Sequence, residues 1–305
     1  MCIRDRHLVD LVKENISLKP YNSWKVGGEA KYFAQPANKD ELSKVYSWAL
    51  EKDIPIYVLG GGTNILVSDL GFDGLVIHTA NMKNLSEVDA SDSYIQFSAQ
   101  SGASKSEVLK IFMKHKLDAA IFLTGLPGDV GGGVVMNAGV GTNTQPKEFN
   151  EIVEWIEVLK PNLDFVRYTH DQLNWQYRKS LNWQPGIITE VGFKYKNTPS
   201  ADFMQKMREA TKRRISTQPI NKPSGGSTFK NPEGYTSGAL IDGLGLKGYK
   251  IGGAEVSTKH ANFLVTDETA SANDLWELIR FIKVKVKEAH DIELHTEVQL
   301  IGQFD

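Results

Sequence analysis

The chain has only one cysteine, Cys2, among 305 residues, so it can form no internal disulfide and no multi-cysteine metal site. A lone thiol is typical of a reducing compartment, and we expect a cytoplasmic location. No run of about eighteen apolar residues is present, and residues 1–6 lack the apolar core of a signal peptide, so no membrane span is expected. His170, Asp171 and His295 have no spacing typical of metal ligands, and we expect no metal site.

Excess charge of either sign is also missing, because 35 Lys and Arg residues balance 37 Asp and Glu residues to a formal charge of -2. This balance gives no general attraction to nucleic acid, so an anionic ligand would have to be held by a local site. The hydrophobic content of 41% and the charged content of 24% are ordinary for a globular protein. The length is enough for about two domains.

What the chain does have is glycine in clusters. The first, Gly60-Gly61-Gly62, follows an apolar β-rich run at 56–59 and precedes a second β-rich run that begins at Ile65. Glycines let the backbone turn tightly and direct several N–H groups at one ligand, so we interpret this loop as a pyrophosphate cradle. A flexible turn alone would give the same pattern. A Rossmann fold does not fit, because its fingerprint requires a helix directly after the glycines.

A second glycine-rich stretch covers residues 125–139. Two such loops, each bounded by apolar β-like segments, suggest a long phosphate-bearing ligand held along its length. The sequences Leu-Gly-Gly-Gly-Thr-Asn-Ile-Leu-Val (59–67) and Gly-Leu-Pro-Gly-Asp-Val-Gly-Gly-Gly-Val-Val-Met-Asn-Ala-Gly (125–139) resemble the FAD-binding loops of the UDP-N-acetylenolpyruvoylglucosamine reductase (MurB) family. The resemblance spans roughly residues 22–304, with the motifs in the family's order. It implies a FAD-binding fold of the vanillyl-alcohol-oxidase type.

The resemblance also implies which residues bind the cofactor. Arg214 is included because the segment around it resembles one that meets cofactor phosphates in the family. The implied FAD-binding residues are Gly60, Gly61, Gly62, Thr63, Asn64, Ile65, Gly125, Pro127, Gly128, Val130, Gly131, Gly132, Asn137, Ala138, Gly139 and Arg214.

Three separate positions match the family's catalytic motifs. Ser227 ends Pro-Ser-Gly-Gly-Ser (223–227), where the family's serine is a proton donor and Gly225 replaces the more usual alanine. Arg178 matches an active-site arginine, and Glu297 matches a catalytic glutamate, although Thr296 stands where proline is typical. Without the resemblance, the same residues are typical of an exposed turn, a solvated basic pair and an edge charge.

The implied chemistry is reduction of an enolpyruvyl ether. Reduced flavin delivers hydride to the β-carbon, Arg178 and Glu297 stabilise the charge at the carboxylate end, and Ser227 gives a proton to the α-carbon. Lys230 would stabilise the transient serine alkoxide. The candidate substrate-binding residues are Tyr177, Lys230, Asn231, His260 and Asn262. A lone histidine is more often structural. The short interval 229–240 resembles the subtype without a long tyrosine loop.

We predict an α+β fold with FAD-binding lobes at 1–79 and 80–200 and a substrate-binding domain at 201–305. Capping patterns predict helices after Asn38, Ser104 and Ser271. Further helices are expected at 8–16, 203–215 and 237–244, and residues 1–6 are expected to be a loose tail. Strands are expected at 54–59, 75–78, 152–159, 187–195, 262–265 and 297–304.

The predicted activity is NADPH-dependent reduction of UDP-N-acetylglucosamine enolpyruvate to UDP-N-acetylmuramate, a step in peptidoglycan precursor synthesis. FAD is the expected cofactor, and NADPH and the UDP-sugar would use one pocket in turn. One alternative is a FAD-dependent alcohol or sugar oxidase of the same fold. Another is a non-catalytic nucleotide-binding protein, for which two glycine loops would suffice. No nucleic-acid or membrane partner is expected, and the oligomeric state stays open.

Overall fold

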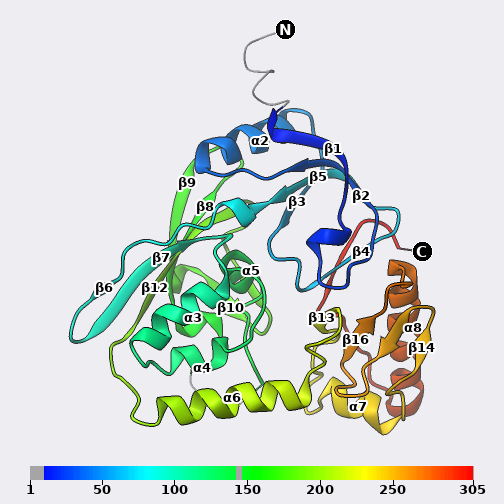
Figure 1. The fold of residues 1–305 in the computed structure, drawn as a ribbon. Coiled ribbons are helices and arrows are strands. Elements are labelled where there is room, and N and C mark those ends of the chain that lie inside the picture. The colour runs from blue at the N-terminus through cyan, green and yellow to red at the C-terminus, as the bar shows by residue number, and fades with distance from the viewer. Residues whose placement is uncertain (1–9, 142–145, 305) are drawn as a thin grey trace. The chain divides into compact units, whose positions relative to one another are not determined.

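The computed structural model describes residues 10–141 and 146–304, and its mixed helices and strands confirm the α+β class (Figure 1). The chain forms two compact units. Unit 1 comprises residues 1–13, 33–61 and 75–212, and unit 2 comprises residues 14–32, 62–74 and 213–305. The expected division at residues 79 and 200 stays a prediction. The expected tail at residues 1–6 lies outside the described residues.

Unit 1 is built on a five-stranded antiparallel sheet with the order β6-β7-β12-β8-β9. These strands are β6 (Asp89–Ala90), β7 (Tyr94–Gln100), β12 (Ile187–Lys196), β8 (Val153–Leu159) and β9 (Phe165–Thr169). The helices α3 (Lys105–Lys114), α4 (Ala119–Leu123) and α5 (Val130–Val135) pack on this sheet through a shared apolar core (Figure 1). In that core the rings of Phe97 and Phe193 stack with their centroids 4.9 Å apart. The strands β10 (Asn174–Gln176) and β11 (Lys179–Leu181) form a separate antiparallel hairpin in the same unit.

A second sheet has the order β1-β2-β5-β3. Its strands are β1 (Val12–Ser17), β2 (Glu29–Ala34), β5 (Phe72–His78) and β3 (Ile56–Leu59), and β3 pairs parallel with β5. The expected helix at 8–16 is wrong over residues 12–16, which belong to the strand β1, because sheet pairing overrides the weak local pattern there; residues 10 and 11 are helical, and residues 8 and 9 lie outside the described residues. The helix α2 (Lys39–Glu51) begins as predicted, with Asn38 Oδ1 accepting a hydrogen bond from Glu41 N at 2.9 Å.

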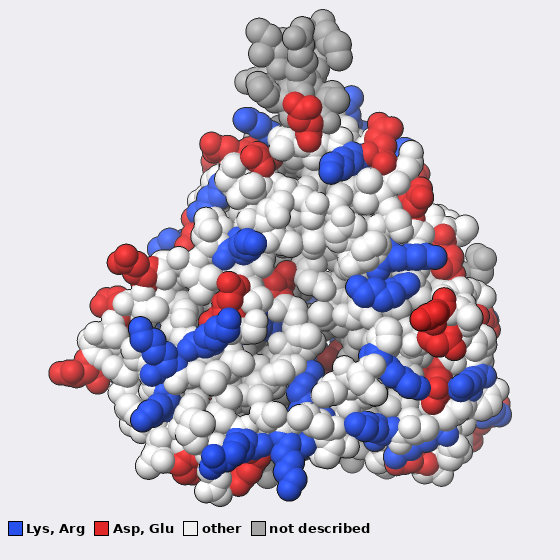
Figure 2. Space-filling view, viewed as in Figure 1, with Lys and Arg blue, Asp and Glu red and all other residues white. Residues whose placement is uncertain are grey.

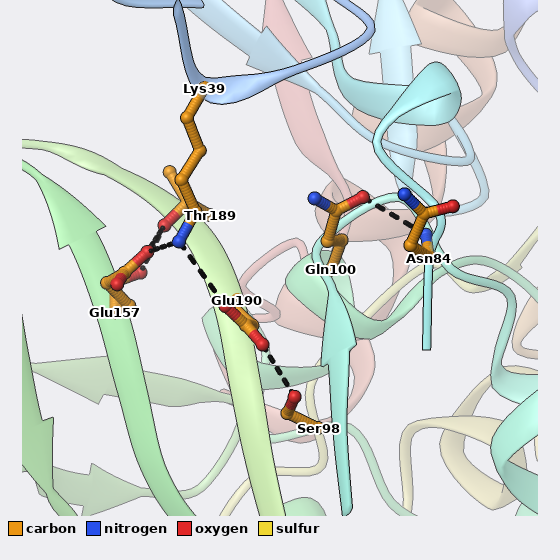
Figure 3. Close-up of polar contacts among 7 residues, drawn as sticks. All are labelled: Lys39, Asn84, Ser98, Gln100, Glu157, Thr189 and Glu190. Carbon is orange, nitrogen blue, oxygen red and sulfur yellow. Dashed lines mark hydrogen bonds and ion pairs between the residues drawn. The ribbon is translucent and has the colours of Figure 1, made fainter. Parts of the chain in front are cut away.

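A charged network joins α2 to the five-stranded sheet within unit 1 (Figure 3). Lys39, the first residue of α2, forms ion pairs with Glu157 and, at 3.3 Å, with Glu190. The Thr189 hydroxyl donates to Glu157 at 2.7 Å, and the Ser98 hydroxyl donates to Glu190 at 2.5 Å. Each carboxylate therefore has a second polar partner, which orients both of them toward the single lysine.

Unit 2 combines three segments that are distant in the sequence. Its four-stranded antiparallel sheet has the order β13-β16-β15-β14, formed by β13 (Ser224–Ser227), β16 (Phe263–Thr266), β15 (Ala254–Val256) and β14 (Lys250–Ile251). The helix α8 (Ala272–His290) begins at the predicted Ser271 capping box and packs on this sheet. The strand β17 (Gln299–Ile301) pairs parallel with β4 (Ile65–Val67), and it is shorter than the expected strand at 297–304.

The remaining helices are α6 (Phe203–Thr217) and α7 (Ser237–Gly243), both close to the predicted ranges. Single 3-10 turns occur at Lys19–Tyr21, Thr79–Asn81, Phe149–Glu151 and His170–Gln172. Within residues 10–141 and 146–304, none of the helices has the length and apolar character that crossing a membrane requires.

Candidate active site

The two glycine loops touch each other within unit 1. A Cβ atom added to Gly60 would lie 2.5 Å from Asp129 Oδ2, and one added to Gly61 would lie 2.9 Å from the Gly128 Cα. These distances are too short for real side chains, so glycine is required at both positions for the loops to approach. The Asp129 carboxylate also accepts a hydrogen bond from the Gly61 backbone.

The second loop lies on residues 101–105, which form its floor. Gly131 N donates to Ser101 O at 2.8 Å, and Val130 N donates to Ala103 O at 2.9 Å. The Lys105 ammonium donates to Pro127 O at 2.9 Å. The floor therefore holds the loop at three successive places.

Part of the second glycine-rich stretch forms a short helix, α5, that the sequence did not predict. Asp129 caps it, because its Oδ1 accepts a hydrogen bond from Gly132 N at 3.0 Å and its backbone oxygen accepts one from Gly133 N at 3.0 Å. The N–H groups at the start of α5 therefore already have protein acceptors. The glycine pattern instead suggested N–H groups without protein acceptors, all directed at one ligand.

Ser101 provides the floor with a buried polar group that lacks a partner within the described part of the protein. Its side chain is buried, and its hydroxyl has no hydrogen-bond partner among the described residues. It lies directly against Gly131, whose added Cβ would approach Ser101 Cβ to 2.9 Å. A buried hydroxyl without a partner is costly, and a cofactor oxygen would satisfy it. The residues here fit a phosphate-bearing dinucleotide.

The sequence analysis missed Lys105 and Asp129. Both are buried beside the second loop. Burial lowers the pKa of the Lys105 ammonium to about 8, although the nearby Asp129 charge opposes this shift. Burial likewise raises the pKa of Asp129. One feature of the sequence could have pointed to Lys105. It stands in the first turn of a predicted helix, where a cation is unfavourable because it opposes the helix dipole.

Arg178 lies at the end of the second glycine loop, in the turn between β10 and β11. Its backbone φ is +57°, which is uncommon for a residue with a side chain. Its guanidinium donates to Gly139 O at 3.3 Å and lies 3.6 Å from the carboxylate of Glu148. Asn137 donates to the same carboxylate at 3.0 Å. Glu148, which the sequence analysis did not single out, therefore links Arg178 to the predicted cofactor loop.

Ser227 lies at the end of β13, directly after an irregularity in the pairing of β13 with β16. Gly226 has a φ of +82° there. A Cβ added to Gly225 would lie 2.6 Å from the Trp24 ring. The replacement of alanine by Gly225 is therefore a packing requirement of this chain, because the buried Trp24 ring occupies the space that a methyl group would need.

Ser227 and Glu297 come together in unit 2 through their backbones. Glu297 N donates to the oxygen of Thr228, the residue after Ser227, at 2.8 Å. The Asn64 side chain donates to Glu297 O at 3.2 Å, and Gln299 N donates to Asn64 O at 3.0 Å. These bonds link Asn64, at the end of the first glycine loop, to Glu297, and link Glu297 to the residue that follows Ser227. Arg178 belongs to unit 1 and is not part of this contact.

The residues after Ser227 are held from several sides. Lys230 N donates to His295 O at 2.9 Å, and the Ser237 hydroxyl donates to Lys230 O at 2.5 Å. Asn231 Oδ1 accepts a hydrogen bond from Ser237 N at 3.0 Å. The Asn231 side chain therefore anchors the first residue of α7, whereas Tyr177, another candidate substrate-binding residue, is exposed.

His260 and Asn262 form the turn before β16. Asn262 is buried, and its side-chain amide binds the backbone of Phe229 at both its oxygen and its nitrogen. Its backbone N–H donates to His260 Nδ1 at 3.2 Å, which places the ring proton of a neutral His260 on Nε2. Burial, assisted by the Lys247 charge, lowers the pKa of His260, in agreement with a neutral ring.

Arg214 lies on α6, over which basic side chains gather (Figure 2). Burial lowers the pKa of its guanidinium, so this side chain is less hydrated than an ordinary surface arginine. Over the described ranges, no group of three or more His, Cys, Asp or Glu residues is arranged to hold a metal ion.

Comparison with known proteins identifies two family models along the chain. Residues 30–168 match the FAD binding domain, and residues 218–301 match the C-terminal domain of UDP-N-acetylenolpyruvoylglucosamine reductase. The first range contains both glycine loops, and the second contains Ser227 and Glu297. The chain therefore contains the FAD-binding region that its glycine loops predicted.

Curated relatives agree with this match over nearly the whole chain. The UDP-N-acetylenolpyruvoylglucosamine reductase of Caldanaerobacter subterraneus subsp. tengcongensis is 35% identical, over 97% of this chain and 98% of the relative. The protein of the same name from Staphylococcus haemolyticus is 35% identical, over 96% and 93%. The crystal structure of the Thermus caldophilus MurB enzyme superposes with a TM-score of 0.75 at 31% identity, covering 95% of this chain and 98% of that one. The chain belongs to the UDP-N-acetylenolpyruvoylglucosamine reductase (MurB) family.

Proposed function

We propose that this chain catalyses the NADPH-dependent reduction of UDP-N-acetylglucosamine enolpyruvate to UDP-N-acetylmuramate with FAD as cofactor. The observation that carries the proposal is the hydrogen-bonded contact of Asn64, Glu297 and the Ser227 segment in a member of this family. This contact supports the proposal that Ser227 acts as the proton donor and Glu297 as the carboxylate of one site. The named relatives are reductases, so the oxidase alternative has no support from them.

The protein's own groups have separate tasks in this proposal. Bound FAD would supply the redox chemistry, the transfer of a hydride from NADPH to the β-carbon of the enolpyruvyl ether. Arg178 binds the substrate carboxylate with its guanidinium fork and fixes the plane of that carboxylate. Glu297 orders the same end of the substrate. Ser227 donates a proton to the α-carbon, which is far more basic than an alkoxide, and Lys230 stabilises the resulting negative oxygen.

We assign cofactor binding to the residues of the two glycine loops that the sequence analysis named. Ser101 is added to the predicted set because its buried hydroxyl has no hydrogen-bond partner among the described residues. We further propose that NADPH and the UDP-sugar use the same pocket in turn, in a step of peptidoglycan precursor synthesis. A cytoplasmic location agrees with the single cysteine.

The test begins with the absorbance spectrum of the purified protein. We expect a flavin spectrum, and NADPH oxidation that depends on added UDP-N-acetylglucosamine enolpyruvate, with UDP-N-acetylmuramate as the product. The control is an assay with alcohols and sugars in place of both substrates, followed by oxygen consumption. A protein that oxidises these compounds without NADPH, or one that recovers no flavin when FAD is added, contradicts the proposal.

The role of Ser227 predicts a separation of the two half-reactions. Ser227→Ala should leave the anaerobic reduction of the flavin by NADPH nearly unchanged, because that step needs no proton from the serine. Reoxidation by the enolpyruvyl sugar should slow by about two to four powers of ten, the usual contribution of a positioned acid. Stopped-flow absorbance measures both steps. Reoxidation of Ser227→Ala at the wild-type rate would remove Ser227 from the mechanism.

A further inference from the structure

We propose that Asn262 is a positioning residue for the proton transfer, fixing the segment that carries Ser227 rather than contacting the substrate. This inference rests on the proposed function, because it assumes that Ser227 is the proton donor. It replaces the expectation that Asn262 binds substrate with a different role. The argument depends only on contacts inside unit 2.

The Asn262 side chain binds one residue of the Ser227 segment at both ends. Its Oδ1 accepts a hydrogen bond from Phe229 N at 2.9 Å, and its Nδ2 donates to Phe229 O at 2.8 Å. Its backbone oxygen accepts a hydrogen bond from Thr228 N at 2.8 Å. Asn262 thus makes three hydrogen bonds to the two residues that follow Ser227.

The regular pairing of β13 with β16 ends at Ser227, and the Asn262 bonds extend it by two residues. Ser227 pairs with Phe263 in the ladder of β13 and β16. Beyond Phe263 the chain turns through His260, whose oxygen accepts a hydrogen bond from Phe263 N at 2.9 Å. No backbone of this turn is bonded to Phe229, and the Asn262 amide takes the place of the missing strand partner. An amide suits this place because it presents one acceptor and one donor, as a backbone does.

The opposite edge of the same segment carries Glu297. Phe229 forms a β-bridge with Thr296, and Glu297 N donates to Thr228 O at 2.8 Å. Asn262 therefore holds the segment on one side, and the backbone of Thr296 and Glu297 holds it on the other. The position of the Ser227 hydroxyl relative to Glu297 depends on both attachments.

Burial indicates that Asn262 acts through the protein. Only 4% of its surface is exposed, and both polar atoms of its side chain are bonded to the Phe229 backbone. A residue this buried, with both side-chain polar atoms already bonded to the Phe229 backbone, makes its contacts with the protein and not with a substrate. The functional consequence of Asn262 is therefore geometric. Misplacement of a reacting group by about 1 Å costs on the order of 100-fold in rate.

The test compares two substitutions of Asn262 in the FAD-loaded enzyme. Asn262→Asp keeps an acceptor for Phe229 N but loses the donor to Phe229 O, and Asn262→Ala loses both bonds. Flavin reduction by NADPH should change by less than about 2-fold, because it needs no proton from Ser227. Reoxidation by the enolpyruvyl sugar should slow by about 10- to 100-fold in both variants, because Asn262→Asp places a carboxylate oxygen against the Phe229 carbonyl. The solvent deuterium isotope effect on reoxidation should increase, because proton transfer becomes slower.

The matched control is Thr266→Val in the neighbouring strand of the same sheet. It removes a buried hydrogen bond from Thr266 Oγ1 to Trp24 O, of 2.8 Å, and leaves all three Asn262 hydrogen bonds to Thr228 and Phe229 in place. It should lower thermal stability but leave the reoxidation rate and its isotope effect unchanged. Wild-type reoxidation in both Asn262 variants, or equal slowing in Thr266→Val, would overturn the inference.

Two outcomes separate this inference from the proposed function. If Ser227→Ala reoxidises its flavin at the wild-type rate, the proton-donor role itself fails. If Ser227→Ala is slow and both Asn262 variants are fast, only the positioning role fails. Should Asn262→Ala not fold, Asn262→Asp decides the question, since it preserves the volume and one of the two bonds.

Discussion

At the scale of single residues, the buried pair beside the second glycine loop has the largest electrostatic consequence. Lys105 holds the Pro127 carbonyl, and Asp129 holds Gly61 and Gly132. The cation and the carboxylate are both almost without water, so neither would stay charged as easily alone. The charge of each group shifts the pKa of the other toward its ordinary value.

A lysine with a lowered pKa predicts a specific dependence of stability on pH. The pKa of Lys105 is about 8 in the folded protein, compared with 10.5 as its ordinary value. Between these values the unfolded chain binds a proton that the folded protein has lost, so the free energy of unfolding rises with pH through this window. Lys105→Met removes this contribution. The unfolding free energy of Lys105→Met minus that of wild type should be highest near pH 7. This difference should fall by about 3 kcal/mol toward pH 10, because only the wild-type value rises over that range.

Urea unfolding of both proteins at several pH values measures this difference. Groups that titrate in the same way in both proteins cancel out of it. The matched control is Lys39→Met. Burial lowers the pKa of Lys39, but Glu157 and Glu190 raise it more, so its net shift is upward. The Lys39 contribution should be constant until the pH passes 10.5. A Lys105→Met difference that does not change between pH 8 and 10 would show that Lys105 is not held as the structure describes.

The sequence identified some site residues and not others for a physical reason. Ser227 and Glu297 stand in recognisable local motifs, and a backbone hydrogen bond from Glu297 N to Thr228 O joins their segments. Glu148 was missed, and Asn262 was assigned to the substrate, because their bonds to Arg178 and Phe229 join residues 30 or more positions apart. Such bonds depend on the completed fold, and neither spacing nor composition reveals them.

At the scale of elements, helix starts were predictable because their capping is local. The caps at Asn38, Ser104 and Ser271 each bond a group three residues away, and all three begin helices. The strand β1 and the helix α5 were not predicted. The first is stabilised by pairing within a sheet, and the second by a cap on a glycine-rich run with little helix propensity.

The close contact of β13 with Trp24 predicts that restoring the family's usual alanine will destabilise this chain. In Gly225→Ala the new Cβ would lie 2.6 Å from the Trp24 ring, which is buried and whose Nε1 donates to Leu264 O at 2.9 Å. Overpacking of this kind costs about 1–3 kcal/mol. Thermal or urea unfolding would show the loss as a lower midpoint.

The control for this change is Gly243→Ala, because a Cβ at Gly243 meets no atom within 4 Å. It should leave stability unchanged or slightly improved, since alanine favours a helix more than glycine does. Adding Trp24→Phe to Gly225→Ala should return part of the lost stability by making room for the methyl group. If Gly225→Ala is as stable as wild type, the Trp24 ring does not occupy that space.

At the scale of the whole molecule, residues that are far apart in the sequence belong to the same compact unit. Unit 2 takes residues 62–74 from the middle of the FAD binding domain match and joins them to the C-terminal region through β4 and β17. Asn64 is therefore beside Glu297 although more than 200 residues separate them. Local patterns predicted each segment, but the parallel pairing of β4 with β17 is set by burial and long-range contacts that a single sequence does not display.

This grouping predicts how cofactor removal will act on different parts of the chain. FAD binds the folded protein, so at about 100 times its dissociation constant it should add about 2.7 kcal/mol to the free energy of unfolding. Stripping FAD should lower the thermal midpoint, and adding FAD back should restore it. Riboflavin, which lacks the diphosphate and the adenosine, is the matched control and should restore much less.

Hydrogen exchange should locate the same effect along the chain. Addition of FAD should slow exchange most at the end of the first glycine loop, residues 62–64. The change should be smaller at Gly131–Gly133, because those N–H groups already donate to Ser101 and Asp129 in the absence of a ligand. Protection should also reach Glu297 and Gln299, since their backbone bonds to Asn64 and Thr228 depend on the order of that loop. Equal exchange with and without FAD at residues 62–64 would contradict the assignment of this loop to the cofactor.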